Sequence, residues 1–443
     1  MEAKTKAKGG IIKGAATIAA GGLAAKLIGA LYRIPLTNLI GGEGIGLYQL
    51  VYPFYCLLLT VSATGIPSSI ATLTARRIAR GEDVKPLFST CMRLFLCIGG
   101  ASTVLMIALA PVLSRVQGEA ALWSGYLALS PAVLTVSAIS VFRGYFQGKG
   151  NMTPTAVSEI VEQAVKVGAG LLLAYFFRDN LYRAVTALLI AVSVSEAVAL
   201  AFLTLVYRRD RRTLLNAPVK GEKPRVKSIL KLSVPVTLSA ILLPLSGLID
   251  SVLIVRLLRA HTENAVALYG LFSGGAVTVI NLPVSVCYGI AAATVPALSA
   301  AVEKGESGRK KMLFSALLTL GLGALAAAAL FFLAEPAVRI LYRSLTGEQL
   351  NTLVRLVKLY AVSAATLSLT QTLSACLTAL GKPGRAAISM AAAMILKTAL
   401  NFLLVRNPNL SVYGAALAAN AGYLVSALLD FSFAVYYTRK KRA

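Results

Sequence analysis

The chain has 443 residues, of which 57% are hydrophobic and 14% are charged, and its mean hydropathy is +0.74. Soluble domains carry about 25% charged residues, so this composition excludes an ordinary soluble protein. The formal net charge of +26 would suit a nucleic-acid-binding protein, but the basic residues gather in loops between apolar stretches. That distribution is the positive-inside pattern that orients membrane helices, so we expect no nucleic-acid partner.

Apolar stretches recur along the whole sequence, and each is long enough to cross a hydrocarbon core of about 30 Å as a helix. They are too long for the strands of a membrane barrel, which have about ten residues. We therefore expect an all-α polytopic membrane protein with about twelve transmembrane helices. The expected spans are residues 10–32, 47–73, 89–112, 124–145, 155–177, 184–207, 230–256, 268–297, 312–333, 358–380, 386–405 and 412–437. The first span lacks a clear signal-peptide cleavage site, and we expect it to be retained.

A basic run near the middle of the chain divides the spans into two sets of six. Nine Lys or Arg residues lie between Arg208 and Lys231. We expect an N-terminal six-helix lobe over residues 1–207, a basic cytoplasmic linker over 208–231 and a C-terminal six-helix lobe over 232–443. Because six is an even number, both termini and the linker lie on one side, which the basic charge predicts to be the cytoplasm.

The two halves resemble each other in the spacing of their turns. Ser130 precedes the turn at Gly148 by 18 residues, and Ser363 precedes the turn at Gly381 by the same number. A lysine then follows inside the next span of each half, Lys166 in one and Lys397 in the other. This pattern predicts two parallel six-helix repeats around a central cavity, and such folds bind substrate between the halves near mid-membrane.

Basic and polar residues inside the spans are candidates for substrate binding, since a charge at the centre of a membrane helix costs about 2.5–3.5 kcal/mol. No acid shares the span of Lys397, so its partner must be another helix, water or an anionic ligand. Arg33 has an alternative role as an anchor at the outer interface. The candidate set is Lys26, Arg33, Lys166, Lys397 and Asn401.

Acidic residues inside the spans are candidates for ion or proton coupling. Glu159, Glu162 and Lys166 fall on one stripe of a helix, where Glu162 and Lys166 are four residues apart and a structural ion pair is the alternative reading. Further along the chain, Glu196 and Asp430 are isolated acids in apolar surroundings.

Signals for an enzyme are missing from the sequence. The one histidine, His261, lies in an outer loop, and the chain contains no phosphate-binding loop and no metalloprotease motif. The five cysteines show no metal-ligand spacing. We therefore expect no catalytic residues, no metal and no cofactor.

Two segments carry a resemblance to a known family. Residues Lys26–Pro53, KLIGALYRIPLTNLIGGEGIGLYQLVYP, and Phe142–Pro154, FRGYFQGKGNMTP, resemble signatures of the stage V sporulation protein B group. Residues Ser158–Gln163, SEIVEQ, continue the match. This group belongs to the multidrug, oligosaccharidyl-lipid and polysaccharide exporter superfamily. The positions that match its signatures include Lys26, Arg33, Glu43, Glu159 and Glu162.

The resemblance implies a two-lobed flippase of the bacterial cytoplasmic membrane, which moves a polyprenyl-pyrophosphate-linked glycan such as a peptidoglycan precursor by alternating access. Anionic membrane lipids and cell-wall synthesis enzymes are the further partners expected. Members commonly have fourteen helices, whereas twelve spans are found here. The alternatives are a cation-coupled multidrug exporter of the same superfamily and, from another class, a membrane glycosyltransferase or a scaffold.

Overall fold

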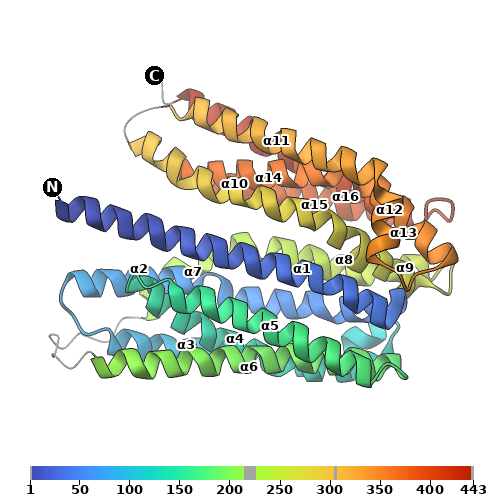
Figure 1. Ribbon diagram of the computed structural model, residues 1–443, viewed down its shortest axis with the longest axis horizontal. Coiled ribbons are helices and arrows are strands. Elements are labelled where there is room, and N and C mark those ends of the chain that lie inside the picture. The colour runs from blue at the N-terminus through green and yellow to red at the C-terminus, as the bar shows by residue number, and fades with distance from the viewer. Residues whose placement is uncertain (1, 214–225, 304–306, 441–443) are drawn as a thin grey trace. The chain divides into compact units, whose positions relative to one another are not determined.

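The computed structural model describes residues 2–213, 226–303 and 307–440, and these residues form long helices joined by short turns (Figure 1). The segments η1 and η3 are π-helical and η2 is a 3₁₀-helix. In chain order the elements are α1 (Glu2–Leu59), η1 (Thr60–Thr64), α2 (Ile66–Ala79), α3 (Lys85–Val116), η2 (Ala120–Leu122), α4 (Trp123–Gly148), α5 (Thr153–Phe176), α6 (Leu181–Thr213), α7 (Val226–Ala240), α8 (Leu242–Leu258), α9 (Ala265–Gly270), η3 (Leu271–Ala276), α10 (Val277–Glu303), α11 (Arg309–Phe332), α12 (Ala334–Leu341), α13 (Gly347–Tyr360), α14 (Val362–Ala379), α15 (Pro383–Val405) and α16 (Tyr413–Lys440).

The expected spans all fall on these helices or on consecutive helical segments, so the prediction of an all-α polytopic membrane protein is confirmed. By length and composition alone, eight of the described helices are able to cross a membrane, or up to nine if the bent pair α13 and α14 forms one span. This count is below twelve for physical reasons. Residues 27–79 run as one continuous stretch, and α7 and α8 have only 15 and 17 residues. Charged residues on α5 lower its hydropathy.

The helices form two compact units. Unit 1 contains Met1–Ile28 and Val51–Leu245, and unit 2 contains Gly29–Leu50 and Ser246–Ala443. This division differs from the expected lobes, because the middle of α1, Gly29–Leu50, belongs to unit 2 while α7 belongs to unit 1. Residues 214–225 of the expected basic linker lie outside the described residues.

A single glycine breaks α1 within the part of this helix that belongs to unit 2. Gly41 has φ 71° and ψ −177°, which is not helical, so α1 is two helical stretches that meet at this residue. A positive φ costs glycine little, because it has no Cβ, but would strain most other residues. The break separates the two stretches without a loop.

Close packing explains why the part of α1 around this break belongs to unit 2. A Cβ added to Gly46 would lie 2.2 Å from the backbone oxygen of Val266 on α9, so only glycine permits this approach. Next to it, Gln49 Nε2 donates to the carbonyl oxygen of Ser273 at 3.0 Å. Ser273 lies in the π-helical segment η3, where α-helical backbone bonding is interrupted. The second half of α1 is thus fixed to elements that follow it by more than 200 residues.

The order of helix contacts is the same in the two units. In unit 1, α4 packs against α2, α3 and α6, and α5 packs against α6. In unit 2, α14 packs against α10, α11 and α16, and α15 packs against α16. Lys166 lies on α5 and Lys397 on α15, which are equivalent helices in this pattern. The repeat predicted from turn spacing is confirmed at the level of helix packing.

Candidate functional site

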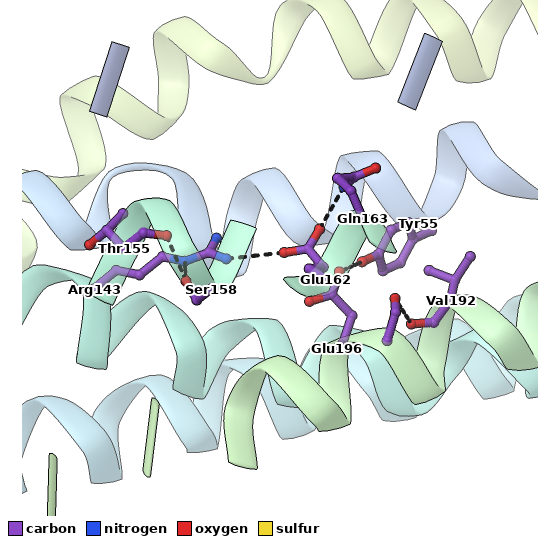
Figure 2. A network of polar contacts seen from close by, with 9 residues as sticks. Tyr55, Arg143, Thr155, Ser158, Glu162, Gln163, Val192 and Glu196 are labelled. Atoms are coloured by element: carbon purple, nitrogen blue, oxygen red, sulfur yellow. Dashed lines mark hydrogen bonds and ion pairs between the residues drawn. The ribbon is translucent and has the colours of Figure 1, made fainter. Parts of the chain in front are cut away.

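A network of polar side chains crosses four helices of unit 1 (Figure 2). Arg143 of α4 donates through Nη2 to Glu162 Oε2 at 3.0 Å and through Nε to Ser158 Oγ at 3.1 Å, both on α5. Gln163 Nε2 donates to the second carboxylate oxygen of Glu162 at 3.1 Å. The side chains of Arg143 and Glu162 are only 16% and 15% exposed, so this is a largely buried ion pair.

Glu196 of α6 is the most deeply buried acid of this network. Its Oε1 accepts a hydrogen bond from the Tyr55 hydroxyl on α1 at 3.3 Å, and its Oε2 is buried without a hydrogen-bond partner among the described residues. Glu162, Arg143 and Lys166 are the charged groups that act on it across the helix interface. A buried carboxylate with one unsatisfied oxygen is suited to take up a proton or a cation.

Three residues form the corresponding polar cluster in unit 2. Lys397 Nζ of α15 forms a short ion pair with Asp250 Oδ2 of α8. Asn401 Nδ2, one turn along α15, donates to Asp250 Oδ1 at 2.9 Å, while Asn401 Oδ1 is buried without a hydrogen-bond partner in the described structure. The exposed fractions of the Lys397 and Asp250 side chains are 12% and 14%.

The partner of Lys397 is therefore an acid on another helix, one of the three alternatives that the sequence left open. Sequence reasoning missed Asp250, although it lies within the expected span 230–256. It also missed Arg143 as a site residue, although Arg143 lies near the end of the expected span 124–145. An inventory of acids inside spans would have found Asp250, but its pairing with a lysine 147 residues away depends on the tertiary fold.

The remaining candidates lie at scattered positions. Arg33, on the unit 2 part of α1, is half-buried, and its guanidinium makes no hydrogen bond or ion pair within the described part of the chain. Glu43 is exposed. Asp430 of α16 is buried and accepts a hydrogen bond from Ser374 of α14 at 2.6 Å.

Three further candidates stay only partly placed. The side chain of Lys26 lies outside the described residues. Glu159 and Lys166 lie on α5 near the unit 1 network, and both take part in polar interactions. Because Lys166 belongs to unit 1 and Lys397 to unit 2, convergence of these lysines on one space stays a prediction.

Comparison with known proteins places the chain in a family. A family model described as "Polysaccharide biosynthesis protein" matches residues 11–302, which is more than half of the sequence. The chain belongs to this family. "Stage V sporulation protein B" of Bacillus subtilis is 28% identical over 96% of this chain and 83% of its own length. "Lipid II flippase MurJ" of the same organism is 23% identical over 95% of this chain and 82% of its own length.

Solved structures show the same fold at lower identity. An inward-facing multidrug resistance MATE family transporter of the MOP superfamily superposes with a TM-score of 0.79 at 18% identity, covering 94% of this chain and 95% of its own. A MOP superfamily transporter from Pyrococcus furiosus, reported to have a binding pocket of reverse polarity, gives a TM-score of 0.69 at 17% identity, covering 98% and 96%. At these identities the likeness establishes the fold of a multi-pass transporter.

Proposed function

We propose that this family member is a flippase that moves a polyprenyl-pyrophosphate-linked glycan across the bacterial cytoplasmic membrane by alternating access, with both termini in the cytoplasm. The observation that carries the proposal is the family match over residues 11–302, together with relatives named as a sporulation protein and a lipid II flippase. Peptidoglycan precursors are the favoured cargo, and cell-wall synthesis enzymes are the proposed partners that supply or consume it.

The chemistry of the cargo explains why buried cations are needed. A pyrophosphate group carries about two negative charges, and hydrocarbon cannot solvate them. Positively charged side chains replace the lost water through charge-assisted hydrogen bonds. We assign this role to Lys26, Arg33, Lys166 and Lys397, with Asn401 as a neutral donor. Arg33 supports the assignment most directly, because no described acid neutralises it.

Lys397 takes part by exchanging one anion for another. In this structure Asp250 neutralises the Lys397 ammonium. Lys397 can therefore lie inside a membrane-spanning helix without an uncompensated charge. A phosphate oxygen that replaces the Asp250 carboxylate keeps Lys397 neutralised, while Asp250 takes up a proton from water, so that no charge is left unpaired, and stays hydrogen-bonded to Asn401. The pair thus keeps the Lys397 cation available for an anionic ligand. While the pair is intact, burying this cation costs the protein little stability.

The acids of unit 1 are proposed to couple transport to a proton or a cation. Glu196 is the first choice, because it lies among charged groups of neighbouring helices and, like Asp430, has one buried oxygen without a partner in the described structure. Glu159 and Glu162 surround it with further negative charge. Of the four acids proposed for coupling, Asp430 is the one that lies in unit 2. Ser374 donates a hydrogen bond to it.

One observation favours a second candidate function, export of cationic drugs coupled to a cation. The unit 1 network contains a buried acid, Glu196, and a largely buried acid, Glu162, and it includes the aromatic residue Tyr55. Acidic and aromatic groups together are the chemistry that binds organic cations. The same network is equally suited to coupling glycan transport to a proton or cation. The two candidate functions are therefore distinguished by their cargo.

The test is translocation in proteoliposomes. Purified protein is reconstituted with a fluorescent lipid-linked glycan, and externally added reagent measures the fraction that crosses. We expect faster exchange than in protein-free liposomes, and no faster exchange of a fluorescent phospholipid of equal chain length. Saturable uptake of an organic cation without glycan movement would replace this proposal with the drug exporter.

A further inference from the structure

A groove of about 700 Å³ lies between α10 and α11, entirely within unit 2. Gly289, Ala293 and Ala297 line it from one face of α10, and Phe314 and Leu318 line it from one face of α11. Its volume falls within the range of about 300–1,000 Å³ that is typical of ligand sites. None of the residues assigned to the transport proposal lines this groove.

Small side chains on α10 leave the space open. A Cβ added at Gly289 would meet nothing within 4 Å, so the helix surface there is not covered by a neighbour. The two helices are nevertheless held together, because Thr294 Oγ1 donates to Ser315 Oγ at 2.9 Å. The facing aromatic ring of Phe314 is 69% exposed. Both helices are long and apolar enough to span a membrane, so we expect lipid chains to be the apolar molecules that reach this groove.

One end of the groove is positively charged. Lys310 and Lys311 lie in the first turn of α11 and line the groove at the end marked by Ala297. From Ala297 to Val286, at the opposite end of the α10 lining, the helix rises by about 16 Å at 1.5 Å per residue. That length is about half of a 30 Å hydrocarbon core, or one leaflet. The groove therefore has the polarity and the depth of one lipid molecule in one leaflet.

We propose that this groove binds an anionic glycerophospholipid, with its phosphate at Lys310 and Lys311 and its acyl chains along α10. Basic pockets between transmembrane helices recognise anionic head groups by charge. The depth of one leaflet favours a phospholipid over a polyprenyl chain, which is longer than a leaflet. The site is separate from the proposed transport residues, so the inference stands without the proposed function.

The first experiment tests the charged end. Native mass spectrometry of the full-length protein measures retention of phosphatidylglycerol against phosphatidylcholine in wild type and in the double variant Lys310→Gln/Lys311→Gln. Each basic residue near a membrane surface is worth about 1 kcal/mol, so the preference for phosphatidylglycerol should fall roughly 30-fold. The matched control is Lys85→Gln/Lys227→Gln, which removes two exposed lysines from the starts of α3 and α7.

The second experiment fills the groove. Gly289→Leu places a side chain in open space, and we expect phosphatidylglycerol retention to fall roughly tenfold, the effect of losing about two buried methylene contacts. Gly321→Leu is the control, because Gly321 on α11 also has nothing within 4 Å of an added Cβ and does not line the groove. Thermal unfolding in lipid-free detergent should be alike for the two glycine variants.

Two outcomes overturn the inference. Retention of phosphatidylglycerol by the Lys310→Gln/Lys311→Gln variant at the wild-type level would remove the head-group site. Equal losses in Gly289→Leu and Gly321→Leu would remove the groove. A competition with polyprenyl phosphate decides the occupant: if it displaces phosphatidylglycerol at equal concentration, the groove belongs to a polyprenyl lipid and the phospholipid assignment is wrong.

Discussion

The two units place their buried charges in different ways. Unit 1 distributes Arg143, Glu162 and Glu196 over three helices, and leaves one oxygen of Glu196 without a described partner. Unit 2 matches one cation, Lys397, with one anion, Asp250. The charges around Lys397 are therefore matched one to one, whereas in unit 1 Arg143, Lys166 and Glu162 all act on Glu196 from neighbouring helices. The repeat preserves the positions of the helices and not the chemistry between them.

This difference suggests a division of labour. A one-to-one pair responds to an incoming anion, because the cation can exchange partners. A buried carboxylate with an unsatisfied oxygen, as at Glu196, responds to an incoming proton or cation, because either one satisfies that oxygen. We therefore assign the head group of the cargo to unit 2 and coupling to unit 1, and the following variants test that assignment.

The largest expected effect is on the stability of unit 2. Lys397→Gln leaves Asp250 buried without its cation, and breaking such a pair costs about 3–5 kcal/mol. Chemical denaturation in detergent measures the loss. The double variant Asp250→Asn/Lys397→Gln removes both charges and should recover most of it. A single variant as stable as wild type would show that water already solvates the pair.

The next largest effect is on the affinity for cargo. Replacing Asp250 and replacing Lys397 should change this affinity in opposite directions. Asp250→Asn releases Lys397 from its acid, so affinity for a polyprenyl-pyrophosphate glycan should rise. Lys397→Gln should lower it by about 1.5–3 kcal/mol, the value of a hydrogen bond to a charged group. Binding to purified protein is measured beside a cationic dye. If both variants weaken glycan binding equally, the pair is structural and anion exchange does not occur.

A smaller change tests the geometry of the unit 1 network. Arg143→Lys keeps the charge, but a lysine cannot reach Ser158 Oγ and Glu162 as the planar guanidinium does. Loss of one hydrogen bond should lower the free energy of unfolding by about 1–1.5 kcal/mol. The control is Arg339→Lys, because Arg339 pairs with Glu335 on an exposed face of α12. Exposed pairs contribute about 0–1 kcal/mol, and this control should be close to neutral.

The smallest effect on stability is expected at Glu196. Glu196→Gln keeps an acceptor for Tyr55 and removes a buried charge, so the unfolding free energy should change by about 1 kcal/mol or less. Transport driven by an imposed ion or proton gradient should nevertheless be lost. Asp430→Asn in unit 2 is the matched variant and should retain gradient dependence. If only Asp430→Asn loses gradient dependence, the coupling site lies in unit 2 and not in unit 1.

Much of the architecture was predictable because hydropathy and turn spacing are local properties. The position of every span followed from apolar length, and the repeat followed from matched turns before Lys166 and Lys397. The site was less predictable, because its partners come from distant positions. Arg143 lies three residues from the end of the expected span 124–145, which suggests an exposed position, but α4 continues to Gly148 and Arg143 is largely buried. Nothing in the apolar pattern predicts that Asp250 faces Lys397.

The assignment of α1 to both units also escaped prediction, since a hydropathy plot shows apolar length and not where a helix packs. A cut in the 208–231 run would therefore not separate two folding modules, because Gly29–Leu50 packs with unit 2 and α7 packs with unit 1. We expect the two fragments to require co-expression for folding, which protease resistance of each fragment alone and of the mixture would measure.

The close approach of Gly46 to Val266, and the bond from Gln49 to Ser273, have a consequence for biosynthesis. The bonded residues are 224 positions apart. At about 5–20 residues per second, a ribosome needs on the order of 10–45 s to deliver the second partner after the first. During that time the Gly29–Leu50 part of α1 is already made while its packing surface in unit 2 does not yet exist. Its glycine-rich face at Gly42 and Gly46 then lies open to lipid or to the insertion machinery, so the order of synthesis and the order of assembly are different for this helix.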